Sequence, residues 1–206
     1  MMSKIKKSVL VVAVLVTVFM VSGYTEVALV NKKVETVKTA NKTINMFVTH
    51  GHCSTPFAGE VNDLKVEYPT RLDLGNPLED MVISFEVDPN SFNVCRAKEL
   101  TSVIKTPGLF IGEKNEKITF TSTNVYTMGL DWYQVNGKMS IKGIEKEVKL
   151  FVTGIRKPNE QIATSLVLDG QVNLFDWGID YDLIVNGKSS PVSTKWLYLN
   201  MKIELL

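Results

Sequence analysis

Hydrophobic and polar side chains alternate along much of the chain. The period of two is clearest in residues 81–87, 133–141 and 197–205, where apolar side chains occupy every second position. Neighbouring residues of a strand point to opposite faces, so each stretch would have one apolar face and one largely polar face. This pattern is typical of an antiparallel sheet with one buried side. We therefore predict a mainly β fold.

Further strands are predicted at residues 43–48, 57–68, 117–126, 147–155 and 162–173, which brings the total to about eight. Turn-forming residues occur at 75–77, 88–90, 128–129, 142–143 and 157–159. Strands of this number and spacing form either an up-and-down barrel or a sandwich.

One dipeptide within the alternating pattern could form either a turn or part of a strand. Asn136-Gly137 is a favoured two-residue hairpin turn, yet the alternation continues through it to Ile141. We therefore place the turn at Lys142-Gly143. Only residues 96–105 are predicted to be helical, and weakly, because β-branched side chains there lower the helix propensity.

Composition and charge limit the class of protein. The 206 residues include 45% hydrophobic and 22% charged side chains, an ordinary composition for one globular domain. The formal net charge of +1 gives no basic excess for neutralising phosphates, so nucleic acid is not an expected partner. Lys4, Lys6 and Lys7 precede the first acidic residue, Glu26. Without residues 1–23, 20 basic and 22 acidic residues remain, a net charge of −2.

The N-terminus has the three parts of a secretory signal peptide. Three lysines precede an apolar stretch that ends in Val21-Ser22-Gly23, where small side chains suit the signal peptidase. We predict a signal peptide over residues 1–23 with cleavage after Gly23, and a polar lead-in over residues 24–42. A retained anchor is the alternative, because the uncharged stretch approaches the roughly 20 residues of a membrane span. The protein would be periplasmic or secreted, with no stable transmembrane anchor after cleavage.

Export affects the interpretation of the two cysteines. In an oxidising compartment Cys53 and Cys95 are candidates for a disulfide, with two unpaired thiols as the alternative. His50, His52 and Cys53 also lie within four residues, which leaves a zinc or copper site as a weaker alternative. We expect no metal there, because the chain has no other His or Cys cluster to complete the ligand set.

Catalytic motifs are absent from the sequence. No Gly-x-Ser-x-Gly elbow or phosphate-binding glycine loop occurs, and no acidic residue lies within three positions of either histidine. We expect a non-enzymatic protein without a catalytic residue or a resident cofactor.

The order of residues, beyond their composition, resembles a known family. Residues 117–125 are KITFTSTNV and residues 133–150 are YQVNGKMSIKGIEKEVKL. They resemble the patterns ITF.ST.V and V.G.L.I.G..K.V.L of the YceI-like family of exported proteins, with Met139 where the family commonly has Leu. Residues 169–178 resemble a segment ending in R.DFG, with Leu174 and Trp177 as replacements. The resemblance covers residues 43–206, the predicted barrel domain.

The departures from the family pattern make the chain a divergent member. The histidine of the family's HL.S..FF segment is missing from residues 98–110, where Pro107-Gly108 intervenes. Cys53 and Pro56 are additions in the first hairpin. The resemblance therefore supports the fold better than it supports the ligand.

The resemblance implies an eight-stranded, antiparallel, lipocalin-like up-and-down barrel. Its interior would bind or carry an apolar lipid-like molecule, such as a polyisoprenoid or the tail of an isoprenoid quinone. An eight-stranded barrel is either filled by its own side chains or holds one small ligand. The alternative is therefore a periplasmic or surface protein-interaction domain with a packed interior, and a homodimer is left open. The candidate lining residues are Met81, Phe85, Phe120, Met139, Ile141, Leu166, Leu168 and Trp177.

Overall fold

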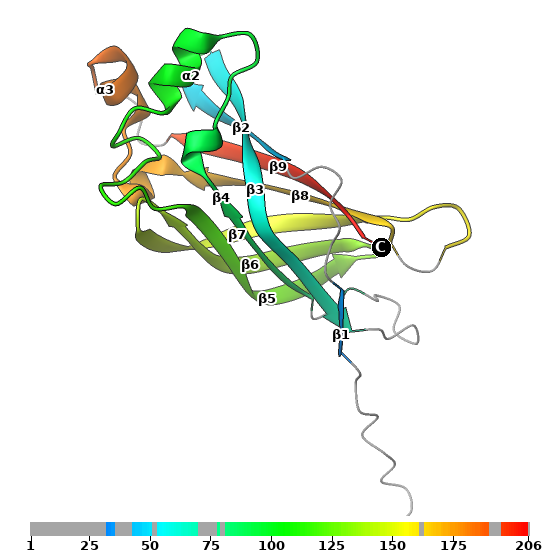
Figure 1. The fold of residues 1–206 in the computed structure, drawn as a ribbon. Coiled ribbons are helices and arrows are strands. Elements are labelled where there is room, and N and C mark those ends of the chain that lie inside the picture. The colour runs from blue at the N-terminus through cyan, green and yellow to red at the C-terminus, as the bar shows by residue number, and fades with distance from the viewer. Residues whose placement is uncertain are drawn as a thin grey trace, which may run out of the picture. The chain divides into compact units, whose positions relative to one another are not determined.

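Eight strands follow one another around a closed antiparallel barrel in the computed structural model (Figure 1). They are β2 (Thr43–His50), β3 (Cys53–Pro69), β4 (Val82–Val87), β5 (Ile118–Gly129), β6 (Trp132–Ile141), β7 (Ile144–Ile155), β8 (Ser165–Asn173) and β9 (Trp196–Glu204). Each strand pairs with the next along the chain, and β2 closes the barrel by pairing with β9. The predicted up-and-down barrel is confirmed, and the sandwich is excluded.

The structure describes residues 32–35, 43–50, 53–69, 78, 81–160, 163–189 and 195–205. These residues all belong to one compact unit of the chain, residues 31–206. The predicted signal peptide and the predicted turn at 75–77 lie outside the described residues.

A short strand precedes the barrel within the predicted lead-in. Strand β1 (Lys32–Glu35) pairs with the last four residues of β3, from Val66 to Pro69. Strand β2 pairs with the first half of β3 up to Glu60, so β1 lengthens the sheet where β2 no longer reaches. The lead-in is therefore not irregular throughout.

The alternating pattern predicts correctly which side chains enter the barrel. The apolar positions of residues 81–87, 133–141 and 197–203 are buried, and the residues between them are half-buried or exposed. Lys142 and Gly143 both adopt positive φ, as a two-residue hairpin turn between twisted strands requires, which confirms the predicted turn. Asn136 and Gly137 lie within β6 and pair on both sides, as the unbroken alternation predicted.

Helical turns gather at one end of the barrel, which we call the helix end. The predicted helix is confirmed as α2 (Lys98–Ile104), and the turn predicted at residues 88–90 is confirmed as the start of η1 (Pro89–Ser91). The helical turns η2 (Leu174–Trp177) and α3 (Tyr181–Asn186) were not predicted. The elements η1, η2 and α3 are each too short to show a helical period in the sequence. Each begins after a residue whose side-chain oxygen accepts a hydrogen bond from a backbone N–H of its first turn, namely Asp88, Asn173 and Asp180. No helix within the described part of the chain is long and apolar enough to span a membrane.

The opposite end of the barrel, which we call the hairpin end, carries the β5–β6 and β7–β8 turns and the last residues of β9 (Figure 1). The predicted turn at 157–159 lies here and is confirmed. The turn predicted at 128–129 lies two residues further along, at Leu130 and Asp131, because Met128 and Gly129 still belong to β5. The two ends differ in what closes them, and this difference bears on any ligand in the interior.

Candidate functional site

The barrel interior brings together all eight predicted lining residues. Each is at most 2% exposed and belongs to the hydrophobic core. Seven belong to the barrel wall: Met81 directly before β4, Phe85 on β4, Phe120 on β5, Met139 and Ile141 on β6, and Leu166 and Leu168 on β8. The eighth, Trp177, ends η2 and lies at the helix end.

Three predicted residues lie side by side across β4, β5 and β6. Phe85 faces Phe120 in the strand register, and Phe120 faces Met139. The two phenyl rings contact each other with centroids 5.3 Å apart. Gly137 leaves room for this arrangement, because a Cβ atom there would lie 2.6 Å from both the Phe120 ring and the Thr121 carbonyl oxygen. The glycine of the sequence motif is therefore explained by the close approach of a core ring to the backbone.

Methionine is a prominent component of the wall. Met46 and Met201 join the predicted Met81 and Met139, and all four are at most 4% exposed. Met201 faces Leu168 in the register of β8 and β9. The alternation of residues 197–205 already placed Met201 on the apolar face, so the sequence contained the signal for it. An unbranched, polarisable side chain adapts its shape to its neighbours, which makes this wall deformable.

Aromatic rings close the helix end. The indole nitrogen of Trp177 donates a hydrogen bond of 2.8 Å to the carbonyl oxygen of Ile144, at the start of β7. Nearby, Phe57 packs against Phe92 and Phe110 with ring centroids 5.0 Å and 5.6 Å apart. Trp177 is therefore held at the end of the interior, whereas the other predicted residues line its wall.

Two polar contacts fasten α3 to the helix end. The Tyr181 hydroxyl donates a hydrogen bond of 3.0 Å to Oγ1 of Thr55 on β3. Burial raises the pKa of Tyr181 above its ordinary value, an effect that this hydrogen bond partly offsets. The Lys195 ammonium lies 2.7 Å from an Asp182 carboxylate oxygen, and its side chain is only 1% exposed.

Sequence reasoning missed the Lys195–Asp182 pair. Nothing in the sequence marks it, because lysine is rarely buried and the two residues belong to different elements. A buried ammonium needs its carboxylate partner, so the pair ties the approach to β9 to α3.

The hairpin end has an ion pair between its turns and a buried hydroxyl group without a partner among the described residues. Arg156 donates hydrogen bonds to both carboxylate oxygens of Asp131, one of them at 2.6 Å, and so joins the β5–β6 turn to the end of β7. This contact raises the pKa of the Arg156 guanidinium. Inside the barrel, Thr127 faces Tyr133 in the register. Oγ1 of Thr127 is buried and has no hydrogen-bond partner among the described residues.

The predicted disulfide is not present in the structure. Cys95 is a free, exposed cysteine in the turn before α2. Cys95 follows Asn93, whose bridge to Ala58 is isolated, and it lies in a turn rather than in a strand. The prediction failed because the spacing of two cysteines along the chain does not show whether the fold brings them together.

The alternative zinc or copper site consists of residues that the structure describes only in part. His52 and the side chains of His50 and Cys53 lie outside the described residues. Within the described ranges no group of three His, Cys, Asp or Glu side chains could hold a metal ion.

Comparison with known proteins gives one family and several structures. The family model of the YceI-like domain matches residues 36–204. The crystal structure of Burkholderia cenocepacia BcnA covers 80% of this chain and 96% of its own, with 15% identity and a TM-score of 0.58. That of the Campylobacter jejuni YCEI protein covers 89% and 92%, with 14% identity and a TM-score of 0.47. No curated protein matches the chain.

Proposed function

Because the chain belongs to the YceI-like domain family, we propose that it is an exported, non-enzymatic protein whose barrel interior binds an apolar, lipid-like ligand. A polyisoprenoid or the tail of an isoprenoid quinone has the required chemistry, since both are long, flexible and apolar. Export to the periplasm or the exterior would put the protein in contact with the membranes that hold such molecules.

The observation that carries this proposal is the continuous apolar wall with four methionines, Met46, Met81, Met139 and Met201. A ligand that enters a close-packed interior must displace side chains from their positions. Methionine allows this at low cost, because it has three rotatable bonds and no branch. A flexible tail would then take the place of rearranged methionine side chains.

The hairpin end is the proposed entrance. At the helix end, Trp177, Tyr181 and Lys195 are each fixed by a hydrogen bond or an ion pair. The hairpin end is also tied by the Arg156–Asp131 pair, but the buried Thr127 hydroxyl there has no partner among the described residues, and a buried polar group generally has one. The polar head of a bound molecule would supply that partner while its tail extends toward the helix end.

The second candidate function is a protein-interaction domain with a packed interior. The low exposure of every predicted lining residue favours it, together with the direct contact between Phe85 and Phe120. An apolar strand face folds into a core whether or not a ligand enters.

Native mass spectrometry of protein purified from its own host separates the two candidates. We expect an apolar molecule to co-purify with the wild type and to be lost from Leu168→Phe, which adds volume inside the barrel. Val167→Phe is the matched control, because the neighbouring side chain points outward on the same strand. Circular dichroism of both variants establishes that they fold.

A second measurement uses a defined probe. Quinones quench tryptophan fluorescence, and the quinone head is expected at the hairpin end, where Trp132 begins β6. A short-chain isoprenoid quinone should therefore quench the fluorescence of the wild type saturably, and that of Trp132→Phe less strongly. The carrier proposal is wrong if the wild type carries no apolar molecule and shows no saturable quenching.

A further inference from the structure

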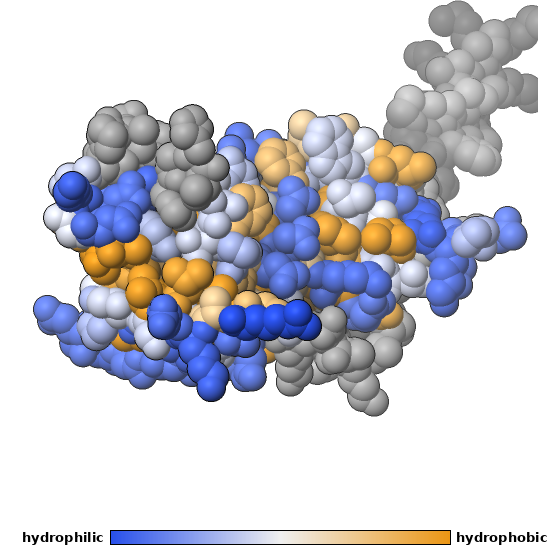
Figure 2. All heavy atoms as spheres, turned by 90° about the horizontal axis from the view of Figure 1, so that it is seen from above, coloured by the Kyte–Doolittle hydropathy of each residue, from blue (hydrophilic) through white to orange (hydrophobic). Residues whose placement is uncertain are grey.

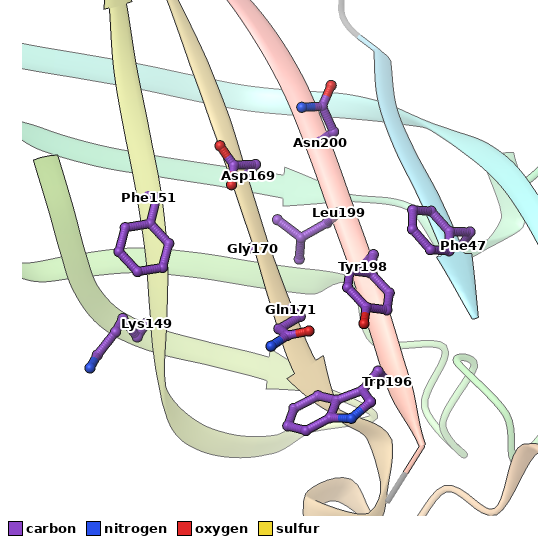
Figure 3. A pocket seen from close by; sticks show the side chains of 10 residues that line it. All are labelled: Phe47, Lys149, Phe151, Asp169, Gly170, Gln171, Trp196, Tyr198, Leu199 and Asn200. Atoms are coloured by element: carbon purple, nitrogen blue, oxygen red, sulfur yellow. The ribbon is translucent and has the colours of Figure 1, made fainter. Parts of the chain in front are cut away.

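The outer wall of the barrel contains a hollow that the interior ligand does not use. It has a volume of about 560 Å³ and lies over β7, β8 and β9, with Phe47 of β2 at its edge. This volume is within the range of small-molecule sites. Figure 3 shows Phe151 on one side, Tyr198 and Phe47 on the other, and Gln171 of β8 between them. The proposal that follows is independent of the interior site.

The aromatic walls of the hollow are held in place by neighbouring rings. Phe47 and Tyr198 face each other in the register of β2 and β9, and their rings are stacked with centroids 4.6 Å apart and planes within 6°. On the other side, Phe151 stacks on Trp132 with centroids 6.2 Å apart. A ligand would therefore meet apolar faces that lose little conformational freedom on binding.

The floor of the hollow is polar. Asp169 lies between Phe151 and Asn200 in the strand register, and Gln171 faces Tyr198. Lys149 adds an ammonium on β7. The side chains of Asp169, Gln171, Lys149 and Asn200 form no hydrogen bond or ion pair with other parts of the chain that the structure describes. Burial raises the pKa of Asp169, so its surroundings already remove part of its hydration.

These groups limit the chemistry of the occupant. One carboxylate and one ammonium leave the hollow without a net preference for an anion or a cation. The carboxylate accepts hydrogen bonds, the ammonium donates them, and the amides of Gln171 and Asn200 do both. Both β8 and β9 pair on each side within the closed barrel, so no strand edge is open for an extended peptide. A lipid tail would leave the polar floor without partners.

A neutral sugar meets all of these requirements. Its ring presents C–H groups that pack on aromatic faces, and its hydroxyl groups project outward and both donate and accept hydrogen bonds. Figure 2 shows that hydrophobic and hydrophilic side chains are interspersed over the face of the molecule seen from above. We propose that the hollow formed by Phe47, Phe151, Asp169, Gln171, Trp196 and Tyr198 binds a residue of a neutral glycan.

Isothermal titration calorimetry with neutral oligosaccharides of glucose, mannose and N-acetylglucosamine tests the proposal. We expect saturable binding of at least one of them by the wild type. Tyr198→Ala should weaken that binding roughly tenfold, because it removes a stacking face. Tyr198→Phe should retain most of the affinity, and Asp169→Leu should weaken it.

Tyr126→Ala is the matched control, since Tyr126 is an exposed aromatic residue of β5 outside the hollow. It should leave the affinity unchanged. Gln171→Ala provides a second variant at an exposed position, should Tyr198→Ala fail to fold. The proposal is wrong if none of the three sugars gives a binding heat, or if the wild type and the variants of the hollow bind a sugar with equal affinity. It is also wrong if the hollow is covered by a second copy of the chain in a dimer. Analytical ultracentrifugation of the wild type and Tyr198→Ala detects the last case.

Discussion

The inner and outer walls of β7, β8 and β9 come from the same strands and differ in nearly every property. Leu168 points into the barrel and is fully buried, while its neighbour Asp169 is exposed. On β9, Leu199 is buried, whereas its neighbour Tyr198 faces outward and is half-buried. The inner wall is apolar throughout and supplies the core, whereas the outer wall combines aromatic and polar groups. A strand therefore offers two surfaces that can serve two purposes, and only the inner one is required for folding.

The contrast extends to charged pairs. Lys195 is buried beside Asp182, whereas Lys138 and Glu145 form an ion pair whose side chains are each about half exposed. Water competes for the exposed pair and hydrates either partner alone. It does not reach the buried ammonium, which depends on one carboxylate.

The largest expected effect comes from placing a charge on each wall in turn. Leu168→Lys buries an ammonium without a partner and should lower the free energy of unfolding by about 3–5 kcal/mol or prevent folding. Asp169→Lys, one residue further, should change it by less than about 0.5 kcal/mol. Urea unfolding of the two variants measures the difference. Similar losses in both would mean that the two walls are not distinct.

Breaking the buried ion pair should have the next largest effect. Asp182→Ala leaves Lys195 buried without its carboxylate and should cost about 3 kcal/mol of stability. Adding Lys195→Met in the same chain should recover much of that loss, because the unpaired charge is then removed. Glu145→Ala on the outer wall should leave the urea midpoint unchanged. An unaltered midpoint in Asp182→Ala would show that water reaches the Lys195 ammonium.

A methyl group added inside the barrel should have an intermediate effect. In Gly137→Ala the new Cβ would meet the Phe120 ring and the Thr121 carbonyl oxygen, both at 2.6 Å. Overpacking of this kind costs about 1–3 kcal/mol. Gly129→Ala is the control, because nothing lies within 4 Å of the corresponding position. Thermal unfolding should show the larger loss of stability in Gly137→Ala, and a larger loss in Gly129→Ala would mean that Gly137 is not closely packed against Phe120.

The smallest expected effect is a pH dependence at Asp169. Asp169 is exposed overall, but partial burial of its carboxyl group raises the pKa above the ordinary 3.8, so the folded state holds the proton more tightly than the unfolded chain. The ionised carboxylate therefore destabilises the folded state. This effect is absent at pH values below the pKa of Asp169 in the unfolded chain and complete above its pKa in the folded state. Asp169→Asn should therefore be slightly more stable than the wild type at neutral pH and equally stable near pH 3. Urea midpoints at the two pH values test this, and a gain confined to acid pH would reverse the sign.

The sequence predicted the wall residues well and the polar contacts poorly. Met139 and Leu168 could be placed because alternation is a local property that a few neighbouring residues reveal. The Cys53–Cys95 disulfide was wrong, and the Lys195–Asp182 pair was missed, because both depend on how separate elements approach each other. The short turns η2 and α3 gave too few residues for a helical period.

By itself, the sequence determined the strands, the faces that they bury and the turn at Lys142-Gly143. The physical reason is that strand periodicity and turn conformation depend on residues close together in the chain. Only the tertiary structure decided which outer residues meet. Phe47 and Tyr198 stack because β2 closes the barrel against β9, at opposite ends of the barrel sequence. The glycan hollow is therefore a product of barrel closure, which no local pattern contains.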